Sequence, residues 1–186
     1  MNWTIPNLLS VFRMALVPLF VAEVLDANAA RALAVFLAAG VTDALDGFIA
    51  RFWGQQSALG AYLDPIADKL LLVTAYVTLA IPQANATLFR IPYWVSALVL
   101  TRDVVIVIMA LVLYLVNGIR RFPPSPVSKV NTAIQVATVV IVLAAGIRPH
   151  LEVVATGAIY AVAASTLLSG LDYLFRANRM SADARP

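Results

Sequence analysis

Six long apolar stretches, separated by short breaks rich in polar residues, Pro or Gly, constrain this chain more than any other feature. They lie at about residues 6–26, 30–53, 61–82, 92–117, 128–147 and 151–175. Each is close to the ~20 residues that an α-helix needs to cross ~30 Å of hydrocarbon. Because backbone groups find no water partners in lipid, such stretches are expected to be helices. The sequence therefore predicts an all-α, polytopic membrane protein with six transmembrane helices.

The composition supports a membrane protein with one domain over residues 1–186. The chain is 62% hydrophobic and 12% charged, whereas a soluble domain carries roughly 25% charged residues. It has no cysteine, which excludes disulfides and thiolate metal sites. The net charge is only +3 with dispersed basic residues, which argues against a nucleic-acid partner. No cleavable signal pattern is visible, so we expect the first apolar stretch to stay in the mature protein.

The placement of Lys and Arg predicts the orientation in the membrane, because basic residues gather on the cytoplasmic side. Six spans put both termini on one side. The basic residues expected on that side are Arg51, Arg120, Arg121, Lys129, Arg176, Arg179 and Arg185. The opposite side would carry Arg31, Arg90 and Arg148. We therefore expect both termini, together with the second and fourth loops, to be cytoplasmic.

Four aspartates inside or at the edge of two neighbouring predicted helices are the most informative residues. Intramembrane carboxylates are costly and mark a functional site by default. Asp43 and Asp46 are three residues apart, and Asp64 and Asp68 are four apart, so each pair lies on one face of its helix. A short turn through Gly54 joins the helices. We expect them to be antiparallel neighbours, with both acidic faces in one cleft near the cytoplasmic end.

A divalent-cation and pyrophosphate site is the chemistry that this cluster predicts. Converging carboxylates would protonate unless a cation compensated them, and oxygen ligands suit Mg²⁺, Mn²⁺ or Ca²⁺ rather than zinc. Gly47 and Gly60 leave room for a bulky ligand beside the backbone, and Arg51 is a fixed cation suited to phosphate. An ion or proton pathway in a non-catalytic membrane transporter is the alternative of another class. Transport alone would not require the paired glycines, Ala50 and Arg51.

The stretch from Asp43 to Asp68 follows a fixed pattern of residue types and spacing. Its members are Asp43, Asp46, Gly47, Ala50, Arg51, Gly60, Asp64 and Asp68. The pattern resembles the full signature of the CDP-alcohol phosphatidyltransferases, also called CDP-alcohol phosphotransferases. The opening from Ile5 to Arg13 is similar to the start of bacterial phosphatidylglycerophosphate and cardiolipin synthases of this family. The resemblance covers most of the chain.

The resemblance implies transfer of a phosphatidyl group from CDP-diacylglycerol to an alcohol, with release of CMP. Asp43, Asp46 and Asp64 would hold two divalent ions, Mg²⁺ or Mn²⁺, while Asp68 would be the general base and part of the second metal's shell. The residues that would bind the CDP donor are Asp46, Gly47, Ala50, Arg51 and Gly60, with Asn7 and Arg13 as further candidates for contact with pyrophosphate or headgroup. The family also implies the bacterial inner membrane and a homodimer.

The acceptor alcohol is open between two glycerol-based compounds. Phosphatidylglycerol would give cardiolipin, and glycerol 3-phosphate would give phosphatidylglycerophosphate. Synthases of phosphatidylglycerophosphate usually carry a lysine at the position of Asn131, and the stretch Thr101-Arg102-Asp103-Val104 resembles eukaryotic-type cardiolipin synthases. Both features favour phosphatidylglycerol. The candidate acceptor residues are Lys69, Arg102, Arg120, Lys129 and Asn131, and for Arg102 with Asp103 a structural ion pair is an equal alternative.

Overall fold

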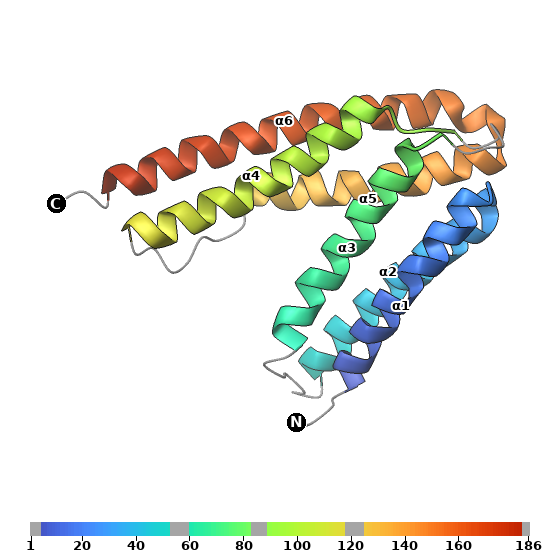
Figure 1. Cartoon of the computed structure of the whole chain (residues 1–186), viewed down its shortest axis with the longest axis horizontal. Coiled ribbons are helices and arrows are strands. Elements are labelled where there is room, and N and C mark those ends of the chain that lie inside the picture. The colour runs from blue at the N-terminus through green and yellow to red at the C-terminus, as the bar shows by residue number, and fades with distance from the viewer. Residues whose placement is uncertain (1–4, 53–59, 83–88, 118–124, 184–186) are drawn as a thin grey trace. The chain divides into compact units, whose positions relative to one another are not determined.

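The computed structural model describes residues 5–52, 60–82, 89–117 and 125–183. These ranges hold six α-helices, one 3₁₀ turn (η1, Pro149–Leu151) and no strand. The helices are α1 (Ile5–Leu25), α2 (Ala29–Phe52), α3 (Gly60–Ala80), α4 (Tyr93–Asn117), α5 (Pro126–Ile147) and α6 (Glu152–Asp183) (Figure 1). The predicted all-α fold is confirmed. The helix ends agree with the predicted bounds within two residues, except that α6 continues to Asp183 instead of ending at residue 175.

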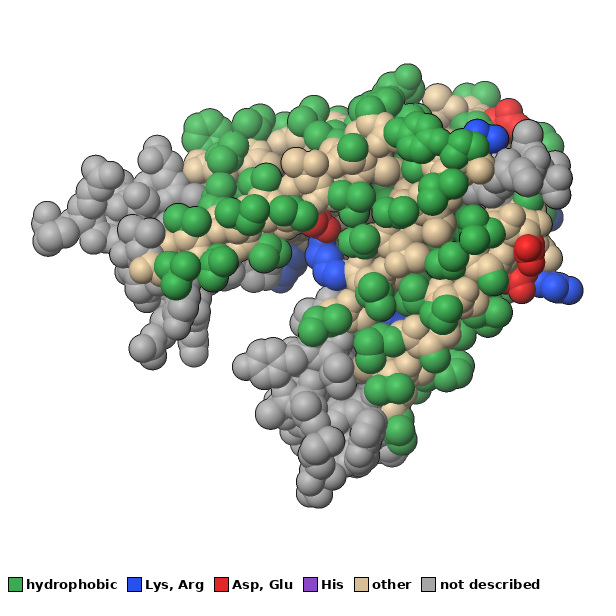
Figure 2. All heavy atoms as spheres, in the orientation of Figure 1, with side chains coloured by type: hydrophobic (Ala, Val, Ile, Leu, Met, Phe, Trp, Pro, Cys, Tyr) green, Lys and Arg blue, Asp and Glu red, His purple; other side chains and the backbone are tan. Residues whose placement is uncertain are grey.

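Three segments of the described chain have the length and hydropathy of a membrane span. They are Leu8–Leu25, Pro126–Ile147 and Pro149–Arg176, where the sequence predicts six. The other three helices, α2, α3 and α4, carry charged side chains. In each of them, the described side chains form a run shorter than the 18 consecutive residues by which a span is recognised. On the face drawn in Figure 2, hydrophobic side chains are spread along the whole described part, and few charged side chains interrupt them. The chain is therefore a membrane protein with apolar helices.

The chain divides into two compact units. Unit 1 comprises Met1–Ile91 and Val139–Glu152, and unit 2 comprises Pro92–Thr138 and Val153–Pro186. In unit 1, α1 packs against both α2 and α3 (Figure 1). The rings of Phe20 in α1 and Phe36 in α2 lie 5.8 Å apart between centroids and form part of this core. The single domain over residues 1–186 stays a prediction.

The turn between α1 and α2 returns the chain alongside α1. Ala27 has a left-handed φ of 57°, a conformation that commonly ends a helix. The N–H of Asn28 donates to the carbonyl oxygen of Glu23 at 2.9 Å. The Oδ1 atom of Asn28 accepts from the N–H of Arg31 at 3.2 Å, which caps the start of α2. This reversal places two of the helices that carry site residues next to each other.

Unit 2 is built from α4, the first half of α5 and α6. Trp94 of α4 and Tyr160 of α6 lie 6.4 Å apart between ring centroids. The hydroxyl of Thr138 in α5 donates to the carbonyl oxygen of Ala158 in α6 at 3.3 Å. At the start of α5, Ser125 is the N-cap residue before Pro126, and its Oγ accepts from the N–H of Ser128 at 3.0 Å. Proline is favoured at the first helical position because its missing N–H would have no partner there.

Candidate active site

The described site residues of unit 1 meet at a buried arginine. Nη1 of Arg13 in α1 lies 2.9 Å from Oδ1 of Asp43 in α2, and it donates a hydrogen bond to Oδ1 of Asp68 in α3. The Arg13 side chain is 1% exposed, whereas those of Asp43 and Asp68 are 46% and 45% exposed. One guanidinium thus joins carboxylates from two other helices while both carboxylates keep an accessible side.

The helical repeat of α1 explains why Arg13 is buried. The buried positions of α1 recur every three or four residues, at Ser10, Arg13, Val17, Phe20 and Val24, which defines one packed face. Asp43 follows the buried Ala39 of α2 by one turn, and Asp68 lies one turn before the buried Leu72 of α3. All three charged side chains therefore continue the packed faces of their helices.

The electrostatic balance of this cluster leaves room for a further cation. A buried guanidinium is stable only when it is paired, and here it has two carboxylates. With both carboxylates ionised, the three groups carry one net negative charge. Because the carboxylates are also nearly half exposed, they can bind a cation on the side away from Arg13.

Oxygen donors from two helices fit a hard divalent cation. Asp43 and Asp68 are the two predicted metal ligands whose side chains the structure describes. Among the described side chains, no group of three His, Cys, Asp or Glu residues is placed to hold a metal ion. The four-aspartate metal site therefore stays a prediction, since the side chains of Asp46 and Asp64 lie outside the described part.

The remaining donor-site predictions fall on residues whose side chains the structure does not describe. They are Asn7 in α1, Asp46, Gly47, Ala50 and Arg51 in α2, and Gly60 and Asp64 in α3. The backbone of α2 is helical without interruption from Ala29 to Phe52, so Asp43 and Asp46 share one face of it. The same holds for Asp64 and Asp68 in α3. Arg120 lies outside the described residues.

A second buried arginine organises unit 2. Nη1 of Arg102 donates to Oδ1 of Asp103 at 2.7 Å, and Nη2 donates to Oγ of Ser128 at 2.6 Å and to Oγ of Ser169. Its guanidinium carbon lies 5.6 Å from the ring centroid of Tyr173, a distance typical of a cation–π contact. These contacts join α4, α5 and α6. They include the structural ion pair that was one of the two alternatives for Arg102 and Asp103.

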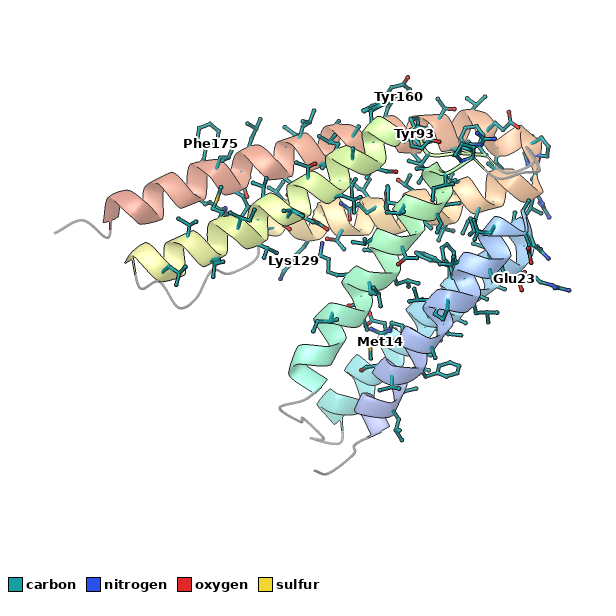
Figure 3. All side chains as sticks on the ribbon, in the orientation of Figure 1. Met14, Glu23, Tyr93, Lys129, Tyr160 and Phe175 are labelled. Atoms are coloured by element: carbon teal, nitrogen blue, oxygen red, sulfur yellow. The ribbon has the colours of Figure 1, made fainter. Side chains whose placement is uncertain are left out.

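The other candidate acceptor residues differ in exposure. Asn131 is fully buried, and its Oδ1 accepts from the hydroxyls of Ser165 at 2.7 Å and Thr166 at 3.1 Å. Lys129 is exposed in the first turn of α5, and Figure 3 shows it pointing away from α6. Lys69 is exposed on α3. Arg102, Lys129 and Asn131 belong to unit 2, and Lys69 belongs to unit 1.

Arg13 is the residue whose pairing with the aspartates the sequence did not predict. It was a candidate for contact with substrate, not the partner of Asp43 and Asp68. The available signal was its place in α1, which is otherwise apolar around it. A charge in such a helix calls for an opposite charge, but the sequence alone does not say which acidic residue provides it.

The sequence is similar to known phospholipid synthases. Residues 3–168 match the family described as CDP-alcohol phosphatidyltransferase. The chain is 40% identical over 161 residues to a cardiolipin synthase (CMP-forming) of Rattus norvegicus, covering 77% of this chain and 51% of that protein. It is 33% identical over 181 residues to a probable phosphatidylglycerophosphate synthase of Mycobacterium tuberculosis, covering 93% and 81%.

A putative cardiolipin synthase of Mycobacterium bovis is 38% identical over 130 residues, which are 69% of this chain and 59% of that protein. The chain spans about half the length of the rat and human cardiolipin synthases. The chain is therefore similar both to proteins named cardiolipin synthase and to proteins named phosphatidylglycerophosphate synthase.

Proposed function

The chain belongs to the CDP-alcohol phosphatidyltransferase family, and from this premise we propose that it transfers a phosphatidyl group from CDP-diacylglycerol to a glycerol-based acceptor. The favoured acceptor is phosphatidylglycerol, which would give cardiolipin and CMP. The observation that carries the proposal is the cluster in which Arg13 joins the carboxylates of Asp43 and Asp68 from two helices. These are the first and last aspartates of the family pattern.

The residues that would hold divalent cations are Asp43, Asp46, Asp64 and Asp68, with two ions expected and Mg²⁺ or Mn²⁺ favoured. The exposed carboxylates of Asp43 and Asp68 support this, because oxygen ligands suit these ions. When bound, the cations would neutralise the charge that develops on the pyrophosphate. Arg13 would hold two of the ligands in position from the buried side.

Asp68 is proposed as the general base. Its carboxylate would accept the proton of the acceptor hydroxyl, whose oxygen forms a bond to the phosphorus that carries the diacylglycerol. The bond from that phosphorus to the oxygen of CMP breaks, and CMP leaves with the electron pair. The hydrogen bond from Arg13 to Oδ1 of Asp68 would orient the carboxylate for this transfer, and positioned proton transfer typically contributes ~10²–10⁴-fold to rate.

The donor would be bound by the two helices that carry the aspartates. Arg51 would pair with phosphate, and Gly47 and Gly60 would let the nucleotide approach the backbone. Ala50 and Asp46 complete this proposed donor site, with Asn7 as a further contact from α1. All of these residues belong to unit 1.

The acceptor assignment rests on Asn131 and on the named relatives, with Arg102 as a further candidate contact. A neutral amide at position 131 suits a phosphodiester, which carries one charge, better than a phosphomonoester, which carries nearly two. The similarity to a protein named cardiolipin synthase at 40% identity supports phosphatidylglycerol. Glycerol 3-phosphate is the second candidate, because a probable phosphatidylglycerophosphate synthase aligns over 93% of the chain. Lys69, Arg120 and Lys129 are proposed as additional cations for either acceptor.

All six helices are proposed to cross the bacterial inner membrane, with both termini and the active site on the cytoplasmic side. Helices α2, α3 and α4 have 24, 21 and 25 residues, which is sufficient for ~30 Å of hydrocarbon. A homodimer is proposed from the family resemblance. Cysteine scanning of the α2–α3 and α4–α5 loops with a membrane-impermeant reagent tests this orientation, since labelling of intact cells would contradict it.

The deciding experiment measures CMP release from CDP-diacylglycerol by the purified chain in detergent with Mg²⁺ or Mn²⁺. Phosphatidylglycerol, glycerol 3-phosphate, serine and inositol phosphate are offered in parallel. We expect CMP and cardiolipin with phosphatidylglycerol, and no CMP in EDTA until excess metal is restored. Phosphatidylglycerophosphate without cardiolipin would select the second acceptor. If no CMP is released with any of the four acceptors, a non-catalytic transporter or ion pathway is favoured. Full turnover after exhaustive chelation would contradict the metal site.

A further inference from the structure

Arg13 approaches the aspartate cluster from its buried side. One nitrogen, Nη1, contacts Oδ1 of Asp43 at 2.9 Å and also donates to Oδ1 of Asp68. The arginine side chain is 1% exposed, whereas the two carboxylates are nearly half exposed. The positive charge is therefore fixed behind the carboxylates, and their accessible side is left for a ligand.

The packing of α1 holds this charge in place. Ser10 and Val17, about one turn before and one turn after Arg13, are buried, and α1 packs against both α2 and α3 (Figure 1). The guanidinium cannot move into water without breaking this close-packed face. Because a buried charge is poorly screened by salt, it acts on any ion that the carboxylates bind.

The net charge of the three described groups changes sign when a divalent cation binds. Arg13 with the ionised carboxylates of Asp43 and Asp68 carries one net negative charge. One divalent cation on these carboxylates turns it into one net positive charge, which is costly beside a buried guanidinium unless an anion pairs with it. Without Arg13, the same cation would neutralise the two carboxylates, and no anion would be required.

We propose that Arg13 makes cation binding depend on the donor. Its charge weakens the binding of Mg²⁺ or Mn²⁺ while the site holds no donor, and it favours the cation together with the pyrophosphate anion of CDP-diacylglycerol. The inference rests on the proposed function and adds a coupling to it, because the cation and the donor then raise each other's affinity by the same factor. Positioning alone predicts the opposite sign, since loss of a positioning residue weakens a metal site.

Three substitutions of Arg13 separate its charge from its role in positioning. Arg13→Gln removes the charge and keeps an N–H donor for a carboxylate, whereas Arg13→Met removes both. Arg13→Lys keeps the charge and loses the planar guanidinium. The matched control is Arg31→Gln, which removes the same charge from a side chain of α2 that is 73% exposed. Arg31 lies twelve residues before Asp43, which is about 18 Å along the helix.

The test measures Mn²⁺ binding to the purified chain in detergent by electron paramagnetic resonance, with and without CDP-diacylglycerol and always without an acceptor. We expect the donor to raise the Mn²⁺ affinity of the wild type about tenfold or more. Arg13→Gln and Arg13→Met should bind Mn²⁺ alone about tenfold more tightly than the wild type, because like charges a few ångströms apart repel even at the dielectric constant of water.

The gain from the donor distinguishes the variants further. In the two neutral variants it should be at least about threefold smaller than in the wild type, because the unpaired positive charge that the donor compensates is gone. Arg13→Lys should keep both affinities within about threefold of the wild type, because the charge remains. Arg31→Gln should do the same, because its charge lies beyond the screening length of about 10 Å at 0.1 M salt.

The remaining outcomes separate this inference from the proposed function. Weaker or unchanged binding of Mn²⁺ alone by the neutral variants would overturn the inference and leave Arg13 as a positioning residue. Loss of the donor effect in Arg13→Lys would overturn it as well, because charge would then not be the cause. If thermal unfolding shows that one neutral variant is not folded, the other decides. A wild type that binds Mn²⁺ but releases no CMP with any acceptor would instead refute the proposed function, and the affinities for Mn²⁺ alone would still decide the effect of the charge.

Discussion

Two buried arginines, Arg13 in unit 1 and Arg102 in unit 2, solve the same electrostatic problem in different ways. Arg13 is balanced by two carboxylates from two other helices, and both carboxylates are nearly half exposed. Arg102 is balanced by Asp103, its neighbour in the chain, whose side chain is only 14% exposed. The other partners of Arg102 are hydroxyl groups and an aromatic ring.

The difference shows which cluster is open to a further charge. The three described groups of the Arg13 cluster together carry one negative charge, and both carboxylates have accessible oxygens, so a cation can join them. The Arg102 cluster is neutral as an Arg–Asp pair, and its carboxylate is largely covered. Breaking a buried pair by removing one partner is strongly destabilising, so the second cluster should contribute strongly to the packing of α4, α5 and α6, whatever contact Arg102 makes with an acceptor. The first should contribute mainly to chemistry.

The largest effect is expected at Asp68, where the open cluster would act as a base. Asp68→Asn keeps an oxygen that can accept from Arg13 but removes the negative charge. We expect the variant to bind CDP-diacylglycerol detectably and to turn over at least ~100-fold more slowly. Single-turnover CMP release and a donor-binding assay measure the two quantities separately.

The matched control for this variant is Asp26→Asn. Asp26 is an exposed aspartate just after α1, and it takes no part in the Arg13 cluster. Its substitution should leave turnover unchanged. Near-normal turnover of Asp68→Asn would show that Asp68 is not the base. The Arg13 cluster would then no longer be distinguished from the Arg102 cluster by a role in catalysis.

Replacing each arginine by glutamine tests the comparison itself. Arg102→Gln should lower the free energy of unfolding by about 3–5 kcal/mol, because the largely covered carboxylate of Asp103 loses its charged partner. Arg13→Gln should lower it less, by about 1 kcal/mol, because water reaches both of its carboxylates. Added Mg²⁺ or Mn²⁺ should restore most of the loss in Arg13→Gln and little of the loss in Arg102→Gln.

Thermal unfolding in detergent, with EDTA and with excess metal, measures this difference without relying on activity. The wild type gives the ordinary metal effect, against which both variants are compared. Equal recovery of the two variants by metal would mean that exposure of the carboxylates does not distinguish the clusters. A loss in Arg13→Gln that metal leaves unchanged would make Arg13 a packing residue only.

The helices could be predicted from the sequence because each stretch that crosses the hydrocarbon core needs about 20 mostly apolar residues, and this pattern is easy to recognise. The end of α6 did not, because the residues after 175 are mostly polar and no longer report burial in lipid. There, continued helical backbone hydrogen bonding extends the helix to Asp183. Hydropathy defines where a span ends, and helix propensity defines where the helix ends.

The same division applies to the site. The proximity of α2 and α3 was expected from a short connection, and helical spacing put Asp43 and Asp68 on defined faces. The pairing of both with Arg13 required knowing which face of α1 packs against these helices, a long-range fact that local spacing does not contain. The sequence called for a cation to compensate the aspartates, and the described structure supplies part of that charge from the protein itself.

Asn131→Lys tests whether a residue of unit 2 selects the acceptor through its charge. If the neutral amide selects the acceptor, an added charge should shift relative activity toward glycerol 3-phosphate by about tenfold, the order of one charge-assisted hydrogen bond. The structure adds a cost, since Asn131 is fully buried and its oxygen accepts from Ser165 and Thr166. Asn131→Met has similar length without charge and should lose stability without the shift. Equal preferences in the two variants would contradict selection by charge.

The smallest effect is expected at Ser125, which caps α5 beside the Arg102 cluster. Its Oγ accepts from the N–H of Ser128, and its own backbone N–H donates to the hydroxyl of Tyr173 at 3.3 Å. Ser125→Ala should lower the free energy of unfolding by about 1 kcal/mol through the lost cap. Glycine is nearly as good an N-cap as serine, so Ser125→Gly should cost only a few tenths of that if capping is the main contribution. If glycine costs as much as alanine, the packing of the buried Ser125 side chain is a larger contribution than its cap.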